Sequence, residues 1–349
     1  MFEHAVARLS VLAPAAVVSL FVSVGLIVLL RPWLARHALA HPNTRSSHHA
    51  PTPQGGGLAV VVASISVGWL AMALAHGIIA QEEVIQLAVV TAAAILLAAL
   101  GAIDDMRGLQ ATPRLAVQCV AVGMIIAALP SEWRILPHLP WWVERACLLL
   151  GGLWFVNLVN FMDGIDWMTV AELVPILCAL CVLAIGGDFD PAPALLAAAL
   201  LGGVLGFAPF NKPVARLFLG DVGSLPLGLL LGWLLLRLAA SGQLVAALIL
   251  PLFYLADATV TLAWRLAARR PFWQAHRTHF YQRAIDRGHS VTQVIARVLG
   301  VNLVLAALAL TTIAAPRLAW PALGAAAALV ACLLMSFVRE RRAITQPLP

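Results

Sequence analysis

The sequence predicts an all-α integral membrane protein with about eleven transmembrane helices. Of its 349 residues, 62% are hydrophobic and only 11% are charged, whereas soluble domains carry about 25% charged residues. The apolar residues form runs close to the roughly 20 residues that a helix needs to cross a bilayer. Composition and run length together indicate a polytopic protein.

Eleven apolar runs of about this length follow one another along the chain. They cover residues 11–30, 58–79, 84–103, 113–129, 146–160, 170–186, 193–210, 222–240, 243–263, 294–314 and 319–338. No internal repeat divides them, so we interpret residues 1–349 as a single transmembrane domain. The first run is not followed by a separate soluble domain, which argues against a cleavable signal peptide.

Positive charge is unequally divided between the two sides of the predicted bundle. Most Lys and Arg residues lie in the connections 31–57, 104–112, 211–221 and 264–293 and in the C-terminal tail. The opposite side carries Arg8, Arg134, Arg145, Arg237 and Arg317. Because positive residues favour the cytoplasmic side, we expect a periplasmic N-terminus, a cytoplasmic C-terminus and a cytoplasmic loop at 264–293.

The net charge of +6 does not indicate a nucleic-acid partner, because the basic residues are scattered between apolar runs rather than gathered on one surface. The five cysteines all fall inside apolar runs, so we interpret them as small buried hydrophobic side chains rather than disulfides or zinc ligands. They are Cys119, Cys147, Cys178, Cys181 and Cys332.

The most informative stretch is 157–166, where two amides and two carboxylates follow an apolar run. On a helix, Asn157, Asn160 and Asp163 would share one face. Asp166 follows after a flexible glycine. Ionisable groups at the edge of a membrane helix are costly and usually functional, and oxygen donors suit Mg²⁺ shared with substrate phosphates. The alternative is a polar helix end that faces water.

The first predicted cytoplasmic connection contains an irregular loop at 43–57 that is rich in His, Pro and Gly. Its three consecutive glycines let backbone amides approach a ligand closely. Arg45 can hold a phosphate through two parallel hydrogen bonds, and His48 is a second candidate for substrate binding. The alternative is a plain turn with an arginine that fixes topology.

Asp104 and Asp105 are adjacent carboxylates at the end of the run 84–103. Two such groups repel each other unless a cation or a proton lies between them. The pair therefore indicates a metal, a phosphate-bound metal or a raised pKa. A solvated helix end is the alternative.

Two further acidic residues belong to predicted spans. Asp221 stands between glycines at the start of the run 222–240, preceded by Asn211 and Phe218. This position is well placed to meet an ion, although an ordinary capped turn would also explain it. Asp257 is a lone acid inside a span, for which pairing with an arginine or protonation is preferred over a catalytic role.

The connection 264–293 contains His276 and His279, which are three residues apart. On a helix the two imidazoles would share one face, and they ionise near neutral pH, so they could bind phosphate or transfer a proton. A basic, aromatic surface segment is the alternative. Zinc is disfavoured, because no Cys or further His lies nearby to complete the ligand set.

Together these motifs resemble the polyprenyl-phosphate N-acetylhexosamine-1-phosphate transferases, bacterial lipid-carrier glycan initiators that include the phospho-MurNAc-pentapeptide translocase. The resemblance covers 42–282 and rests on 43–57, the pair at 104 and 105, 157–166, 211–224 and 276–282. The histidine segment and the 45–57 loop look most like the branch that starts O-antigen synthesis.

The resemblance implies a phosphoglycosyltransferase at the inner face of the bacterial cytoplasmic membrane. Undecaprenyl phosphate would attack a UDP-N-acetylhexosamine, releasing UMP and starting a cell-surface glycan such as lipopolysaccharide. Two polyanions must be brought together, which requires a divalent cation and positive side chains. The implied cofactor is Mg²⁺, with Mn²⁺ as an alternative. The implied partners are the two substrates and membrane lipid, with a homodimer left open.

The resemblance also implies roles for individual residues, by matching positions. The metal would be held by Asn160 and Asp221. The catalytic residues would be Asp104 and Asp105 at the lipid phosphate, with Asp163 and Asp166 at the nucleotide. Further substrate contacts would come from Asn157, Asn211, Phe218 (stacked on uracil), Arg45, His48, His276 and His279.

Two residues depart from the family pattern. Trp167 stands where a glycine is common, which would narrow or reshape the sugar pocket, and Gln54 stands where a basic residue is common. The main alternative function is a secondary transporter for an anionic substrate. Transporters keep their charges near the bilayer midplane, often in paired repeats, whereas here the acids gather at one edge, which favours the enzyme.

Overall fold

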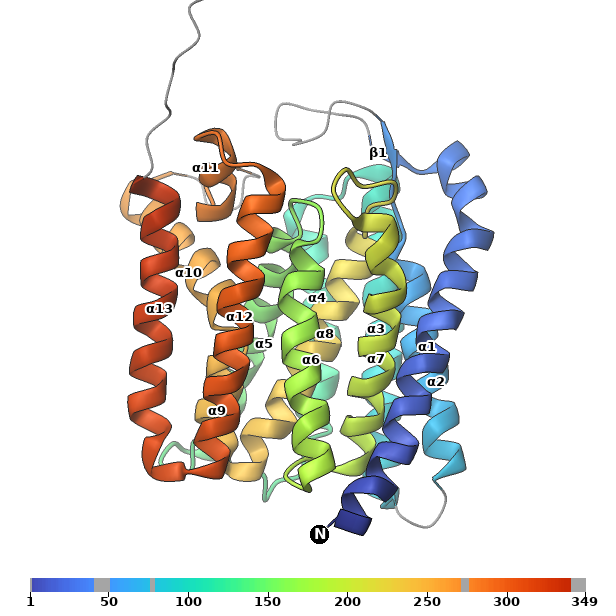
Figure 1. Cartoon of the computed structure of the whole chain (residues 1–349), viewed down its shortest axis with the longest axis vertical. Coiled ribbons are helices and arrows are strands. Elements are labelled where there is room, and N and C mark those ends of the chain that lie inside the picture. Colours follow the sequence, from blue (N-terminus) through green and yellow to red (C-terminus); the bar gives the residue numbers. More distant parts are fainter. Residues whose placement is uncertain (1, 41–50, 76–78, 271–275, 340–349) are drawn as a thin grey trace, which may run out of the picture.

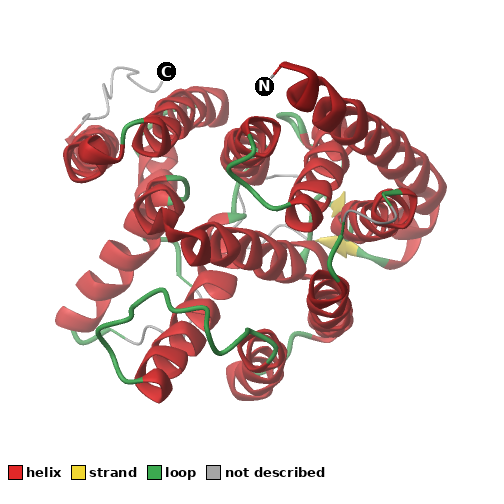
Figure 2. Ribbon diagram, turned by 90° about the horizontal axis from the view of Figure 1, so that it is seen from below, coloured by secondary structure: helices red, strands yellow, loops and turns green. Residues whose placement is uncertain are grey.

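The computed structural model describes residues 2–40, 51–75, 79–270 and 276–339. They form one bundle of helices, seen from the side in Figure 1 and end-on in Figure 2. In these residues the only sheet is a two-stranded ribbon of β1 (Leu39–Ala40) and β2 (Thr52–Pro53). The predicted all-α fold is confirmed.

The helices of the bundle follow the predicted apolar runs. They are α1 (Phe2–His37), α2 (Gly57–Leu74), α3 (Gln81–Arg107), α4 (Ala111–Ala127), α5 (Trp141–Met162), α6 (Met168–Gly186), α7 (Pro191–Asn211), α8 (Asp221–Leu238), α9 (Leu244–Ile249), α10 (Leu252–Ala267), α12 (Val291–Ala314) and α13 (Ala319–Arg339). A short helix, α11 (Phe280–Asp286), follows the histidine segment. Within the described ranges, nine helical spans are long and apolar enough to cross a membrane.

Two of the eleven predicted spans take another form, which explains the smaller number. The run 113–129 corresponds to α4, whose 17 residues are short for a crossing. The run 243–263 is divided between α9 and α10 at Pro251, because proline cannot donate the backbone hydrogen bond that continues a helix. A π-helical turn with the left-handed Gly242 (φ 86°) joins α8 to α9.

Helix α8 packs against α2, α3 and α5, and the span that it begins is the most buried in the described chain. Helix α3 crosses α8 so closely that a Cβ on Gly101 would lie 2.2 Å from the backbone oxygen of Asp221. Small residues allow membrane helices this close an approach. The crossing places the end of α3, with Asp104 and Asp105, beside the start of α8.

The remaining helices complete the bundle around this pair. Helix α7 packs against α1 and α2, and α6 packs against α7 and α12. Helix α1 begins at the lower end of the bundle and α13 ends at the upper end, where β1 and α11 also lie (Figure 1). The two ends of the described chain therefore lie at opposite ends of the bundle.

Candidate active site

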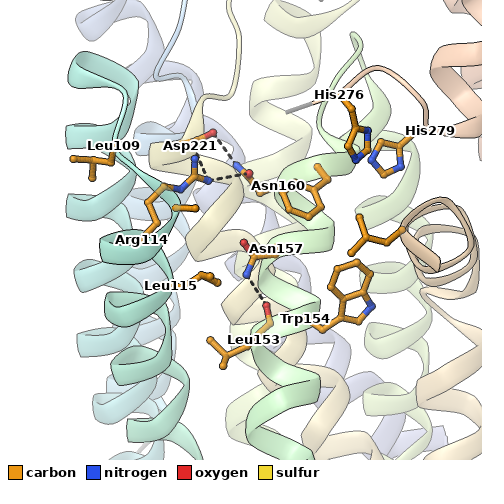
Figure 3. A pocket seen from close by; sticks show the side chains of 13 residues that line it. Leu109, Arg114, Leu115, Leu153, Trp154, Asn157, Asn160, Asp221, His276 and His279 are labelled. Carbon is orange, nitrogen blue, oxygen red and sulfur yellow. Dashed lines mark hydrogen bonds and ion pairs between the residues drawn. The ribbon is translucent and has the colours of Figure 1, made fainter. Parts of the chain in front are cut away.

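A cavity of about 710 Å³ lies among α4, α5, α8, α10 and the segment that precedes α11 (Figure 3). Its polar lining consists of Arg114, Asn157, Asn160, Asp221, His276 and His279. Its apolar lining consists of Leu109, Ala111, Leu115, Leu153, Trp154, Phe161 and Leu262. The cavity therefore joins charged groups to a hydrophobic wall.

Arg114 of α4 lies at the centre of the acidic groups. Its Nη1 is 2.6 Å from Asp104 Oδ2, and its Nη2 is 3.4 Å from Asp221 Oδ2. Nη2 also donates to Asn160 Oδ1 at 3.3 Å. Sequence reasoning misses Arg114, because it falls in the run 113–129 and lies outside every motif; the available signal is a lone cation within an apolar run.

The amide of Asn160 is oriented by α8. Its Nδ2 donates to Asp221 Oδ1 and to Ser224 Oγ, both at 2.8 Å. Oxygens of Asn160, Asp221 and Asp104 thus face one positive group, the guanidinium of Arg114. Carboxylate and amide oxygens are the donors that Mg²⁺ prefers, so these residues fit a divalent cation.

A cation at this position would need further ligands. In the part of the chain that the structure describes, no three His, Cys, Asp or Glu side chains form a metal-binding group. Mg²⁺ commonly keeps several waters and binds through one or two carboxylates together with substrate phosphates. The donor set therefore suits a metal that is completed by a phosphorylated substrate.

Asp105 has different contacts from its neighbour Asp104. Its Oδ1 accepts the backbone N–H of Asp221 at 2.9 Å, and its Oδ2 accepts that of Val222 at 3.1 Å. A carboxylate at a helix N-terminus is favourable. The left-handed Gly220 (φ 76°) permits this contact, because a Cβ there would lie 2.6 Å from Asp105 Oδ2. Asp105 thus positions α8, and its predicted catalytic role stays a prediction.

Residues 53–56, which end the first loop, are hydrogen-bonded to the segment before α8 and to the end of α3. Phe218 N donates to Pro53 O at 2.8 Å, and Gly56 N donates to Phe218 O at 2.9 Å. Gln54 Nε2 donates to the backbone oxygen of Asp105 at 3.1 Å. These bonds fix the backbone of Phe218, for which uracil stacking stays a prediction. The predicted ligands Arg45 and His48 lie outside the described residues.

Asp163 follows α5 and accepts a hydrogen bond from Thr169 Oγ1. Burial raises the pKa of Asp163 to about 8; nearby carboxylates, Asp221 foremost, also raise it, while the Thr169 hydrogen bond lowers it. A carboxyl group with this pKa is largely protonated at neutral pH. It can then donate a hydrogen bond as well as accept one.

Asp166 and Asn211 are buried and bonded to backbone groups. Asp166 Oδ2 accepts the N–H of Ala215 at 2.9 Å. Asn211 Oδ1 accepts the N–H of Trp167 at 2.8 Å, and its Nδ2 donates to Leu217 O at 3.0 Å. Both side chains hold the loop after α5 against the segment before α8. The catalytic role of Asp166 and the substrate contact of Asn211 stay predictions.

Trp167 adopts a left-handed conformation with φ 62°, which explains why glycine suits this position. Its indole Nε1 donates to Ala208 O of α7 at 2.6 Å. Trp167 does not line the described cavity. The indole is directed at α7, where it anchors the loop that carries Asp163. The expected narrowing or reshaping of the sugar pocket stays a prediction.

His276 and His279 lie across the cavity from Arg114 (Figure 3). Their rings stack with centroids 5.1 Å apart. They do not share a helical face, since His279 immediately precedes α11 and His276 lies before it. The backbone between them instead brings the rings face to face.

Comparison with known proteins identifies the family. The family model described as glycosyl transferase family 4 matches residues 87–239. A decaprenyl-phosphate N-acetylglucosaminephosphotransferase of Mycolicibacterium smegmatis is 30% identical over 291 residues, which are 72% of this chain and 70% of that protein. The chain belongs to glycosyl transferase family 4. It is thus a multi-pass membrane protein of this family.

Two further relatives of this family 4 chain match most of its length. A decaprenyl-phosphate N-acetylglucosaminephosphotransferase of Mycobacterium leprae is 28% identical over 319 residues, covering 80% of this chain and 77% of that protein. A probable undecaprenyl-phosphate N-acetylglucosaminyl 1-phosphate transferase of Bacillus subtilis is 26% identical over 301 residues, covering 81% and 82%. Both alignments extend well beyond the residues that the family model matches.

In this family 4 chain, five residues predicted from the sequence line the cavity: Asn157, Asn160, Asp221, His276 and His279. Asp104 joins them through Arg114. Asn157 is bonded away from the acidic groups, since its Nδ2 donates to Gln118 Oε1 at 2.7 Å.

Proposed function

We propose that this protein transfers an N-acetylhexosamine 1-phosphate from a UDP-sugar to undecaprenyl phosphate and releases UMP. The observation that carries the proposal is the convergence of Asp104, Asn160 and Asp221 on one cation position in a cavity that also has an apolar wall. Relatives named as decaprenyl-phosphate and undecaprenyl-phosphate transferases support a polyprenyl phosphate as the acceptor.

The reaction exchanges one phosphorus–oxygen bond for another. An oxygen of the lipid phosphate forms a bond to the sugar-linked phosphorus, and the bond from that phosphorus to the UMP oxygen breaks. Asn160 and Asp221 would hold Mg²⁺, which when bound neutralises phosphate charge. Asp104, fixed by Leu109 N at 2.6 Å and by Arg114, would orient the lipid phosphate. A phosphate monoester is largely ionised near neutrality, so removal of a proton by an aspartate is not essential.

The two histidines and Arg114 supply positive or hydrogen-bonding groups on opposite sides of the cavity (Figure 3). Protonated imidazoles and guanidinium groups stabilise phosphate charge that develops during transfer. Their separation across one cavity suits two phosphorylated reactants. Holding both reactants in one geometry accounts for much of the acceleration in such reactions.

A second, apolar cavity supports a polyprenyl phosphate as the acceptor, because it suits the polyprenyl tail. It has a volume of about 300 Å³ and lies among α4, α5, α8, α9 and the start of α10. Apolar side chains and glycines dominate its lining, and Trp154 lines both cavities. An amphipathic substrate would thus place its phosphate in the polar cavity and the first part of its tail in the apolar one.

The side of the membrane and the glycan are part of the same proposal. The excess of Lys and Arg at the connections that carry the site favours the cytoplasmic face of the inner membrane. The resemblance of the 276–282 segment to the O-antigen branch favours lipopolysaccharide-type synthesis. A panel of UDP-sugars determines which amino sugar the protein transfers.

Transfer of labelled sugar phosphate tests the proposal. Purified protein with Mg²⁺ and undecaprenyl phosphate should form a labelled lipid from at least one of UDP-GlcNAc, UDP-GalNAc and their 6-deoxy analogues. Asp221→Ala and Asp104→Asn should abolish the transfer without lowering membrane insertion, while Asp188→Asn, an exposed acid outside the site, should retain it. Wild-type activity in both site variants would overturn the assignment, and sugar-nucleotide uptake without transfer would favour a transporter.

A further inference from the structure

Asp257 of α10 is fully buried (0% exposed). Its carboxylate is nevertheless surrounded by hydrogen-bond donors. Its Oδ1 lies 3.1 Å from Nδ1 of His279 and accepts the N–H of Phe280 at 3.0 Å. Its Oδ2 accepts the N–H of Tyr281 at 3.1 Å. Thr261 Oγ1 also donates to Oδ1, at 3.3 Å. The acid that stands alone in an apolar run of the sequence is thereby bonded to residues 22 to 24 positions later in the chain.

These contacts set the arrangement of the His279 ring. A carboxylate only accepts hydrogen bonds, so the ring nitrogen that faces it must carry the hydrogen. His279 is itself buried (2% exposed) but lines the cavity together with His276. Among the described residues, Nε2 of His279 has no hydrogen-bond partner. With Nδ1 bonded to Asp257, Nε2 is the ring nitrogen left for a ligand.

Asp257 also holds the segment that carries the ring. Phe280 and Tyr281 are the first residues of α11, whose backbone N–H groups lack partners within the helix. The hydroxyl of Tyr281 donates to Phe161 O at 3.1 Å, which attaches α11 to the end of α5. One carboxylate therefore fixes both the start of α11 and the orientation of the imidazole.

We propose that Asp257 is the positioning residue for His279: it binds Nδ1–H and thereby presents Nε2 to a phosphate in the cavity. In the neutral ring Nε2 accepts a hydrogen bond, and in the protonated ring it donates one. In many sites a carboxylate that accepts a hydrogen bond from one ring nitrogen of a catalytic or metal-binding histidine fixes the tautomer of that histidine. The identity of the ligand rests on the proposed function, whereas the tautomer does not.

The tautomer can be measured without substrate. In ¹⁵N-histidine-labelled protein at a pH of about 8.5, where imidazoles are mostly neutral, two-bond ¹H–¹⁵N spectra should show His279 as the Nδ1–H form. The signal is assigned by its loss in His279→Asn. Asp257→Asn and Asp257→Ala should reduce the Nδ1–H population or shift its proton resonance. An unchanged His279 signal in both variants would overturn the proposal.

Glu172→Gln provides the matched control. Glu172 is another fully buried acid within a membrane helix, and Asn302 Nδ2 donates to its Oε2 at 2.7 Å. It makes no described contact with His279. If loss of any buried carboxylate disturbed the ring through the fold, this variant would shift the His279 signal as well; the proposal expects no shift.

Two substitutions of His279 distinguish the roles of its two ring nitrogens. The amide nitrogen of Asn lies near the position of Nδ1, and that of Gln lies near the position of Nε2. His279→Asn should keep the thermal midpoint within about 2 °C, roughly 1 kcal/mol, while weakening UMP binding about tenfold or more. His279→Gln should lower the midpoint more and weaken binding less. The reverse ranking would contradict the assignment of Nε2 to the ligand.

A double-mutant cycle completes the test. Asp257→Asn should lower kcat about tenfold or more in the His279 protein but less than about twofold in the His279→Asn background, because interacting residues are not additive. Equal losses in both backgrounds would show that Asp257 acts only on the fold. An inactive wild-type enzyme with the expected tautomer would refute the proposed function and leave the positioning role standing.

Discussion

At the residue scale, Arg114 provides the positive charge that contacts the two candidate metal ligands, Asn160 and Asp221, and also Asp104. An arginine that contacts two carboxylates relieves their repulsion when no metal is bound. A cation at the same position would take over that task. Arg114 and Mg²⁺ are thus expected to stabilise the same acidic groups.

Removal of Arg114 should therefore make the fold depend on the metal. We expect Arg114→Gln to lower the thermal midpoint in EDTA by about 2–4 °C, the equivalent of about 1 kcal/mol, and Mg²⁺ to restore most of that loss. Arg107→Gln, an exposed arginine at the end of α3, is the control. If Mg²⁺ raised the midpoint of Arg114→Gln no more than that of the wild type, the two charges would not be equivalent.

Asp163 makes the free energy of unfolding depend on pH, and the direction of its pKa shift sets the sign of that dependence. Its pKa is raised from 3.8 to about 8 in the folded protein, so the folded state binds more protons than the unfolded state between these values. The free energy of unfolding then falls as the pH rises from about 4 to 8. Asp163→Asn removes this dependence and should have the higher midpoint at pH 8, with little difference near pH 4.

Thermal unfolding in EDTA across this pH range measures the effect. Asp188→Asn, which changes an exposed acid at the other end of the bundle, should follow the wild-type curve. Parallel curves for Asp163→Asn and the wild type would show that Asp163 is not protonated in the folded state.

At the element scale, the apolar runs predict the helices well, because a span must be both long and hydrophobic. What they do not predict is where a run is interrupted or shortened. Pro251 divides one run into α9 and α10, and α4 has only 17 residues. Arg114 lies in the first turn of α4, where it contacts the acids. The adjacent pair Asp104 and Asp105 likewise suggests one shared role, but only the fold shows that Asp105 caps α8.

The crossing of α3 and α8 makes a prediction at this scale. Gly101→Ala would place a methyl group 2.2 Å from a backbone oxygen of α8, so the helices must separate, at a cost of about 1–3 kcal/mol. Gly123→Ala in α4 meets nothing within 4 Å and should be neutral or slightly stabilising, by up to about 1 kcal/mol. Thermal unfolding in detergent compares the two, and equal midpoints would contradict the close crossing.

At the scale of the whole molecule, the sequence indicates which residues carry chemistry but not how they meet. Asp257 and His279 are 22 positions apart, and Asp257 lies outside every motif, so their contact cannot be predicted from the sequence. Asp104 and Asp221 are brought together only by the α3–α8 crossing and Arg114. Motif composition therefore predicts the kind of site, while packing between distant helices decides its members.

The proposed orientation in the membrane can be tested with introduced cysteines. In a background without the native cysteines, a membrane-impermeant maleimide should label Glu132→Cys in intact spheroplasts, because the connection between α4 and α5 is expected outside. Lys212→Cys, between α7 and α8, should react only after permeabilisation. Both side chains are exposed in the structure. The opposite pattern would place the candidate site on the periplasmic side.

The apolar cavity beside the site is small, at about 300 Å³. That space can enclose only the first few isoprene units of a carrier, so most of a long tail would remain dissolved in the bilayer. Selection would then act on the units nearest the phosphate and hardly on total chain length. Carriers of ten or eleven units would be nearly interchangeable, and a much shorter synthetic analogue would still turn over.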